Sequence, residues 1–201
     1  MCGRYNVEPH AGALLEAYGI LGELIREIEP RRNVKPGTQI PIISGMPELG
    51  QALWGYVPIW SKTDWSGPKP INARADRITG GIWRGAKRCL VPMSGFYEPG
   101  KPARARWKAG EQKRYYYFWH ENHPLFAAGL MSGGEHATVT IITVEANSTV
   151  AACRHNRMPA LLSGDEPMIW LSRDYETADV RDLLAPADDD FLASREVANM
   201  G

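Results

Sequence analysis

The sequence predicts an α+β fold: a single domain whose core is a curved, barrel-like antiparallel β-sheet, flanked by a few helices. Many short strand-like runs are spread along the 201 residues, whereas only two segments have a helical pattern. No strand-like run leads through a glycine-rich loop into a helix, which argues against a Rossmann or P-loop fold. We assign residues 1–201 to this one domain and treat 186–201 as a C-terminal tail.

The helical segments lie near the two ends of the chain. Residues 11–28 place five apolar side chains on one helical face, namely Leu14, Tyr18, Leu21, Ile25 and Ile28. Pro30 lies just beyond this face, where a helix is expected to have ended. A second, short surface helix is expected from Glu176 to Leu184.

The strand-like runs occupy the middle of the chain. The turn at Pro36-Gly37 precedes a short strand at Ile40–Ile43. Further strands are expected at 51–57, 88–92, 114–119, 125–130 and 137–144. The last run, ATVTIITV, is rich in β-branched residues and bounded by polar ones, which is typical of a strand. Segments 61–72 and 98–113 are expected to be loops.

Composition narrows the class of protein. The chain is 44% hydrophobic and 23% charged, as in soluble globular proteins. It contains no apolar run of the roughly 18 to 20 residues that a membrane span needs. The N-terminus lacks the apolar stretch of a signal peptide. Three cysteines argue against a disulfide scaffold and for a reducing compartment. We therefore expect a cytoplasmic protein without a membrane partner.

A neutral total charge hides an asymmetry along the chain. Residues 1–160 carry 20 basic and 13 acidic side chains, whereas residues 161–201 carry 3 basic and 10 acidic ones. The segment 84–114 is especially basic. A local field of one sign attracts a polyanion such as nucleic acid. A solvated basic loop beside an acidic tail is the alternative interpretation.

Cys2 is notable for its position. Removal of Met1 would make Cys2 the N-terminal residue, with an α-amine that titrates near ~8 and a thiol near ~8.5. An aldehyde condenses with such an amine to a Schiff base, and the thiol then closes a five-membered thiazolidine ring. An internal cysteine cannot do this, because its nitrogen is an amide. The alternative is a frayed terminus without a role.

Four further side chains are suited to proton transfer or anion binding. His155 follows the 137–144 run and can carry protons near neutral pH, or it is structural. Glu98 is the only acid in residues 77–110 and is either a tuned acid/base or an ion-pair partner. Asn72 can donate to an oxyanion or cap a turn. Arg74 can bind a phosphate or form a surface ion pair.

The cysteines and tryptophans offer weaker signals. Cys89 has the setting of a buried strand cysteine, and no pair of cysteines has zinc-ligand spacing, so we expect neither a metal nor another cofactor. Tryptophans at 54, 60, 65 and 83 flank basic and polar segments, as they do where single-stranded nucleic acid stacks on aromatic rings. We expect at least two of these four to belong to the core.

The order of motifs along the chain carries a resemblance that no single motif carries. The series consists of MCGRY, NVKPGT, WGYVPIW, INARA, RCLVP, GFYE, FAAGL, IIT with AN, and HNRMP, and the match that it carries spans essentially residues 2 to 171. It resembles the SOS response-associated peptidase (SRAP) family. This resemblance implies an α+β domain with a curved antiparallel sheet that binds single-stranded DNA, traps abasic sites as a thiazolidine crosslink, and removes its own Met1.

The resemblance also implies roles for individual residues. Cys2 would be the crosslinking nucleophile, Asn72 would orient the sugar oxygens, Glu98 would carry protons, and His155 would act on the deoxyribose hydroxyl. Five residues are implied to contact the DNA strand: Arg4, Pro36, Arg74, Thr143 and Arg157. Cleavage by β-elimination from the Schiff base is a side path. We expect a monomer with little sequence specificity and a marked salt dependence.

Two aromatic positions depart from the family pattern, and other activities compete with the one implied. Pro99 stands where the family usually carries tryptophan, and Ser61 stands where some members carry a second tryptophan, for which Trp65 is a candidate substitute. The C-terminal motif also lacks its proline. The alternatives are an N-terminal nucleophile amidohydrolase, for which the expected arginine and Asn-Gly motifs are missing, a cysteine peptidase that uses Cys2, Glu98 and His155, and a nucleic-acid-binding module without chemistry.

Overall fold

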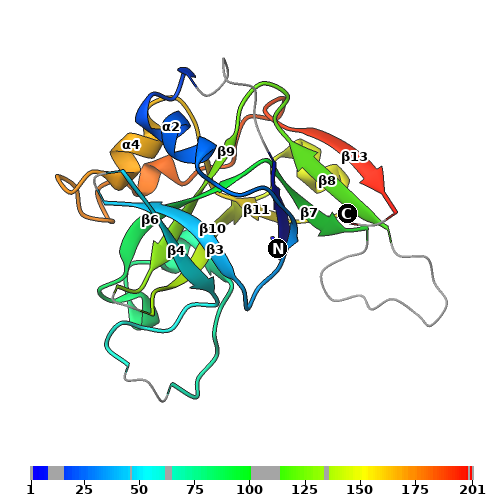
Figure 1. Cartoon of the computed structure of the whole chain (residues 1–201). Coiled ribbons are helices and arrows are strands. Elements are labelled where there is room, and N and C mark those ends of the chain that lie inside the picture. The colour runs from blue at the N-terminus through cyan, green and yellow to red at the C-terminus, as the bar shows by residue number, and fades with distance from the viewer. Residues whose placement is uncertain are drawn as a thin grey trace.

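The computed structural model has the predicted fold class, a mixed α+β arrangement made mostly of curved sheet (Figure 1). It describes residues 2–8, 16–45, 47–61, 65–100, 114–133, 136–198 and 200. The strands form two sheets, one of eight strands and one of five. No helix among the described residues has the length and apolar character needed to cross a membrane.

The eight-stranded sheet closes on itself, which confirms the barrel-like core. Its closed ring consists of β10 (Thr138–Glu145), β4 (Glu48–Trp54), β3 (Gln39–Ser44), β6 (Lys87–Met93) and β9 (Leu125–Met131). The ring closes because β10 pairs with both β4 and β9. Three shorter strands attach to it: β5 (Asn72–Arg74), β11 (Arg157–Pro159) and β12 (Leu161–Leu162). Such closure leaves fewer exposed strand edges.

The strand β10 is the centre of this sheet. It pairs with β4, β5, β9 and β11, and every residue from Thr138 to Val144 is buried. Burial on both faces explains why its sequence is an unbroken apolar run rather than an alternating one. The pairs with β4 and β5 are parallel, unlike the antiparallel pairing expected from sequence. Long chain segments separate these strands and supply the crossover that parallel pairing needs.

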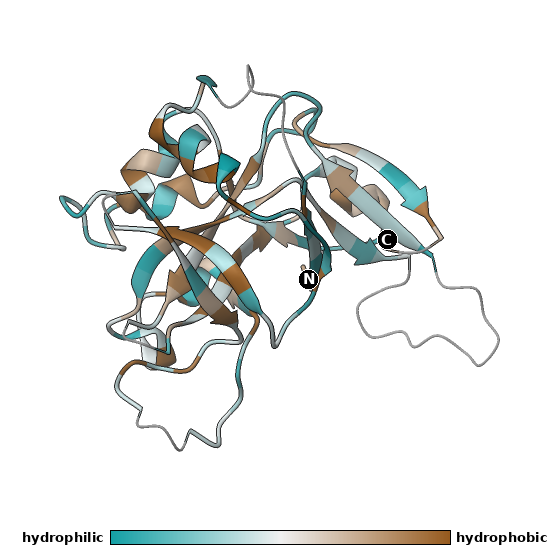
Figure 2. Cartoon of the chain, viewed as in Figure 1, coloured by the Kyte–Doolittle hydropathy of each residue, from teal (hydrophilic) through white to brown (hydrophobic). Residues whose placement is uncertain are grey.

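The five-stranded sheet is wholly antiparallel. Its order is β13 (Ala193–Val197), β8 (Tyr115–Trp119), β7 (Gly95–Pro99), β1 (Arg4–Val7) and β2 (Arg31–Val34). The edge strand β13 comes from the segment treated above as a tail. Figure 2 shows that hydrophobic residues gather in the strands at the centre of the molecule. Trp54 is buried there, and Trp83 packs against the same core.

The helices are short. They are α2 (Ile20–Arg26), α3 (Ser148–Ala152) and α4 (Glu166–Leu171), with 3-10 turns η1 (Ala75–Arg77), η2 (Gly81–Trp83) and η3 (Arg181–Leu183). Within the expected helix 11–28, residues 11–15 lie outside the described residues and α2 begins at Ile20. The predicted helix at Glu176–Leu184 is wrong, since only η3 forms there. The Asp179 carboxylate accepts from the Glu176 backbone amide at 2.9 Å, as at a helix start, but no α-helix follows it.

The other predicted strands are confirmed with shifted ends, and the predicted loops are shorter than expected. Asn72 begins β5 instead of ending a loop, and Glu98 lies in β7. Of the second predicted loop, residues 101–113 lie outside the described part of the chain. Two of the polar residues proposed for chemistry therefore lie on strands, where their directions are fixed by the sheet.

Gly95 in β7 leaves space for a ring from the next strand. A Cβ at this position would lie 2.5 Å from the Phe118 carbonyl oxygen and 2.5 Å from the Tyr117 ring. Gly95→Ala is therefore expected to lower the free energy of unfolding by about 1–3 kcal/mol, as overpacking does. Urea unfolding with a linear extrapolation measures this change. Gly80→Ala is the control, because a Cβ there meets nothing within 4 Å. Equal unfolding midpoints for the two variants would contradict the steric argument.

Candidate functional site

The four residues predicted to do chemistry come together around Cys2. The Asn72 side-chain amide donates to the Cys2 carbonyl oxygen at 2.9 Å. His155 Nδ1 lies 3.3 Å from Glu98 Oε2. Burial and then the nearby charge of Glu98 raise the pKa of the Cys2 thiol. Cys2 and Glu98 are fully buried and His155 is 4% exposed, so these three side chains are shielded from water, while Asn72 is half-buried.

Sheet pairing explains why residues so far apart in sequence meet. Arg4 of β1 lies opposite Tyr97 of β7, so the chain before Arg4 runs beside the end of β7 that carries Glu98. Side chains alternate along β7, and Glu98 therefore points to the opposite face from Tyr97. Asn72 of β5 lies in register with Ile141 of the central strand β10. The site thus lies where the five-stranded sheet, which positions Cys2 and Glu98, meets the eight-stranded sheet, which carries Asn72.

The hydrogen bonds of His155 determine where its protons lie. Its Nε2 atom is 2.6 Å from the carbonyl oxygen of Pro99. A carbonyl oxygen only accepts, so Nε2 carries a hydrogen. The contact between Nδ1 and Glu98 therefore holds one proton, either on the carboxyl or on the imidazole. The Pro99 contribution is a main-chain group, which sequence analysis did not identify and which any residue at this position would provide.

Burial controls the acid–base properties of the site. Desolvation raises the pKa of the Glu98 carboxyl above its usual range, because a buried carboxylate loses its hydration. Desolvation, and after it the charge of Glu98, raises the pKa of the Cys2 thiol. At neutral pH the thiol is protonated. Nucleophilic use of Cys2 sulfur thus needs a group that accepts its proton during the reaction.

Asn72 has an unused acceptor. Its Oδ1 atom is buried and accepts no hydrogen bond from the described residues, while its Nδ2 atom is taken by Cys2. An unpaired buried acceptor costs about 1–3 kcal/mol, so such atoms occur where a ligand supplies the donor. A hydroxyl or amine bound beside Cys2 would satisfy it.

A second group of predicted residues lies next to the first. Arg157 donates to Thr143 through its guanidinium, with Nε 3.4 Å and Nη2 3.3 Å from the hydroxyl oxygen and a further bond to the Thr143 carbonyl. Arg74 is held by two bonds of 2.9 and 3.0 Å to the carboxylate of Asp76. Desolvation and the charge of Arg74 lower the pKa of Arg157. An anion between the two guanidiniums would relieve their repulsion.

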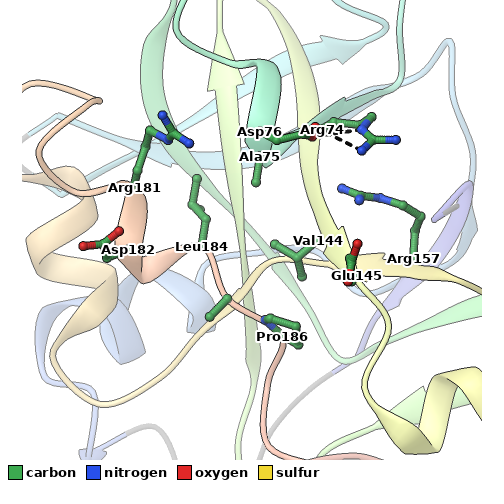
Figure 3. Close-up of a pocket in the computed structure, with 11 residues that line it drawn as sticks. Arg74, Ala75, Asp76, Val144, Glu145, Arg157, Arg181, Asp182, Leu184 and Pro186 are labelled. Atoms are coloured by element: carbon green, nitrogen blue, oxygen red, sulfur yellow. Dashed lines mark hydrogen bonds and ion pairs between the residues drawn. The ribbon is translucent and has the colours of Figure 1, made fainter.

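Figure 3 shows these two arginines at the edge of a cavity of about 500 Å³. The wall facing them comes from η3 and the residues that follow it. Arg74 and Arg157 lie at the side of the cavity formed by β5, β10 and β11. The cavity is therefore part of the same region as the Cys2 site.

The other two predicted contact residues belong to β1 and the turn after β2. Arg4 donates from Nη1 to Asn33 Oδ1 at 3.3 Å. Asn33 has a positive φ of 52°, which asparagine tolerates. Its backbone amide donates to the side-chain oxygen Oδ1 of Asn6 at 2.8 Å. Pro36 is half-buried in the turn between β2 and β3, and the neighbouring Gly37 amide is anchored to the Trp54 carbonyl at 2.8 Å. Asn33 thus orients Arg4, a role that sequence analysis did not assign.

The structure describes only some of the aromatic and basic residues that the sequence indicated for nucleic-acid binding. Trp60 is 55% exposed, and the Trp65 ring lies edge-on to it with centroids 5.7 Å apart. Trp65 therefore stands beside the position where the second tryptophan is replaced by Ser61. Five of the basic side chains of segment 84–114 lie in 101–113, outside the described residues.

Known proteins resemble this chain in sequence and in fold. Abasic site processing protein YoaM of Bacillus subtilis is 30% identical over 221 residues, covering 100% of this chain and 92% of that protein. Abasic site processing protein HMCES of Gallus gallus is 32% identical over 171 residues, covering 67% of this chain and 48% of that protein. A crystal structure of a Bacteroides thetaiotaomicron protein superposes with a TM-score of 0.77 at 26% identity, covering 98% and 93% of the two chains.

A likeness of fold alone extends to a phage-related protein of Bordetella bronchiseptica. Its crystal structure gives a TM-score of 0.72 at 24% identity and covers 98% of this chain and 95% of the other. The family model described as SOS response associated peptidase matches residues 1–200. The chain therefore belongs to the SRAP family.

Proposed function

We propose that this protein recognises abasic sites in single-stranded DNA and shields them through a covalent thiazolidine crosslink to Cys2 after removal of Met1. The observation that carries the proposal is the position of Cys2, held by Asn72 beside the buried Glu98–His155 pair. The relatives named abasic site processing proteins support the substrate class. We place this activity in the cytoplasm, at the nucleoid when DNA is bound, and assign it to a monomer.

The chemistry needs an amine, a thiol and a proton carrier in one dry site. The α-amine of Cys2 attacks the C1′ aldehyde of the ring-opened deoxyribose, and loss of water gives a Schiff base. The sulfur then bonds to the imine carbon, and the thiol proton ends on the nitrogen. The net reaction joins aldehyde and aminothiol as a thiazolidine and releases one water molecule.

The Glu98–His155 pair supplies the proton movements in this scheme. Glu98 delivers a proton to the carbinolamine oxygen that leaves as water, and it takes one up in the reverse direction. His155 exchanges a proton with the deoxyribose hydroxyl as the sugar ring opens. Asn72 Oδ1 accepts a hydrogen bond from a sugar hydroxyl, which satisfies its unpaired acceptor.

The DNA backbone is bound by charge beside this site. Arg74 and Arg157 hold a phosphate between them, and Arg4 holds another. Thr143 fixes Arg157, and Pro36 lines the path of the strand. An abasic site has no base to read, so recognition rests on these contacts and on stacking against Trp60.

A cysteine peptidase or amidohydrolase is the alternative function, and the histidine geometry disfavours it. In such enzymes a base takes the thiol proton directly. Here the Cys2 thiol donates to the Arg4 carbonyl at 3.9 Å, and the contacts of His155 go to the Pro99 carbonyl and to Glu98 rather than to the sulfur. Hydrolysis is thus limited in this proposal to removal of Met1, and β-elimination from the Schiff base is a side reaction.

The first test concerns Cys2. Protein whose Met1 has been removed, as verified by mass spectrometry, is mixed with single-stranded DNA that carries one abasic site. A heat-stable band at the summed mass is expected on a denaturing gel. Cys2→Ala should abolish this band and leave non-covalent DNA binding intact, because the thiol is required only for ring closure. A control strand without the lesion should give no band. A band that persists in Cys2→Ala would overturn the proposal.

The second test concerns the proton carrier. Glu98→Gln keeps the size and a hydrogen-bonding oxygen but cannot give up a proton to the leaving hydroxyl. The crosslinking rate should fall by about 10²-fold, the usual contribution of a positioned acid or base. DNA affinity should not change, because the buried carboxyl does not contact phosphate. Quench-flow gels give the rate and fluorescence anisotropy gives the affinity. A rate equal to that of the parent protein would exclude Glu98 as the proton carrier.

The third test concerns the arginine pair. Each of Arg74→Ala and Arg157→Ala should weaken DNA binding and reduce the slope of log K against log salt by about 1, since one phosphate contact is lost. Arg173→Ala is the control, because Arg173 lines a different cavity. The slope is measured by anisotropy over a series of salt concentrations. An unchanged slope for both variants would show that the pair holds no phosphate.

A further inference from the structure

The cavity beside the arginine pair has features that a phosphate does not need. Its volume is about 500 Å³, and Figure 3 shows apolar side chains within its lining. Val144, Ala75, Leu184 and Pro186 provide this apolar surface. A phosphate is small and strongly hydrated, so it gains no binding energy from contact with apolar side chains. A flat, partly apolar group such as a nucleobase gains from burial against such a surface.

The position of the cavity relates it to the lesion. Asn72 and Arg74 are alternate residues of β5 and point to the same side of the strand. Their separation along the strand is about 6.6 Å, two residues at roughly 3.3 Å each. Arg157 likewise follows His155 by two residues. The cavity therefore begins about 6.6 Å along the strand from the residue that would contact the abasic sugar. The nucleotide that adjoins this sugar would lie at the cavity.

Glu145 gives this cavity a hydrogen-bond acceptor. It lines the cavity between Val144 and Arg157 (Figure 3). Glu145 lies directly opposite Arg157 in the β10–β11 pairing, yet the Arg157 guanidinium is turned onto Thr143. The exposed Glu145 carboxylate makes no hydrogen bond or ion pair with a described residue, and its charge attracts the nearby guanidiniums of Arg74 and Arg157. It is free to accept from a ligand, and a carboxylate accepts but does not donate.

We propose that this cavity binds the nucleobase adjoining the abasic site and that Glu145 favours bases with an exocyclic amino group. Guanine presents N1–H and an amino N–H along one edge and matches a carboxylate best. Cytosine and adenine present one amino group each. Thymine has carbonyl oxygens on both sides of its single N–H and would face the carboxylate with like partial charge. This inference rests on the proposed function, since it takes the lesion to lie at Cys2.

The test uses binding rather than crosslinking as its readout. Single-stranded oligonucleotides carry a tetrahydrofuran abasic analogue, which has no aldehyde, and differ only in the base on its 5′ or 3′ side. Anisotropy titrations should give an affinity about fivefold higher for the oligonucleotide with guanine than for the one with thymine. This is the low end of the effect of one carboxylate–base contact. The preference is expected on one side of the lesion only. Equal affinities for guanine and thymine on both sides would overturn the proposal.

Two variants separate the carboxylate from general charge effects. Glu145→Gln should bring the ratio of guanine to thymine affinities to one, whatever it does to the affinities themselves. Asp190→Asn removes an acid outside the cavity and should keep the ratio of the parent protein. A ratio that survives in Glu145→Gln would also overturn the proposal.

The two proposals fail in different ways. Oligonucleotides with a natural abasic site are tested for crosslinking in parallel. If no crosslinks form but oligonucleotides with the analogue still bind with different affinities according to the neighbouring base, the covalent function alone is contradicted. Crosslinks that form without any neighbour preference would contradict the base cavity alone.

Discussion

The contact between Glu98 and His155 is the constraint around which the rest of the site is arranged. A carboxyl and an imidazole that are buried together are stabilised when they share a proton and have hydrogen-bond partners for their other polar atoms. The Pro99 carbonyl is the partner of Nε2. The contact also requires that β7 and the chain before β11 be held at a fixed separation. β7 belongs to the five-stranded sheet and follows the barrel strand β6 after Ser94 alone, while β11 pairs with β10 of the barrel, so the direct connection from β6 to β7 helps to maintain that separation.

The strands of the core were predictable because the apolar residues in their sequences indicate that they are buried. The 137–144 run is apolar throughout, and it became the strand that is buried on both faces. The strands that were missed are short: β12 has two residues, β5 and β11 have three, β1 and β2 have four, and β7 and β13 have five. A period of two is hard to recognise in so few residues. Three of them form because β9 and β10 offer them edges, and the other four form because they pair with one another and with β8, which is tertiary information.

The chemical residues were predictable one at a time, but their grouping was not. Cys2, Glu98 and His155 were each identified by position or by local charge, with structural alternatives for each. Only the order of motifs, through the family resemblance, implied that they act together. The bond from Asn72 to the Cys2 carbonyl and the bond from His155 to the Pro99 carbonyl use main-chain atoms. Sequence does not reveal which main-chain groups a side chain will meet.

The distribution of charge explains how a neutral protein presents a DNA site. The acidic C-terminal part contributes η3, which faces the arginines Arg74 and Arg157 across the cavity. Asp76 pairs with Arg74 at the surface, so the cations are compensated when no DNA is present. In the proposed function a strand phosphate would replace Asp76 as the partner of Arg74, so charge would contribute an affinity that depends on salt. Discrimination would then come from what fits beside Cys2, because every strand carries the same backbone charge.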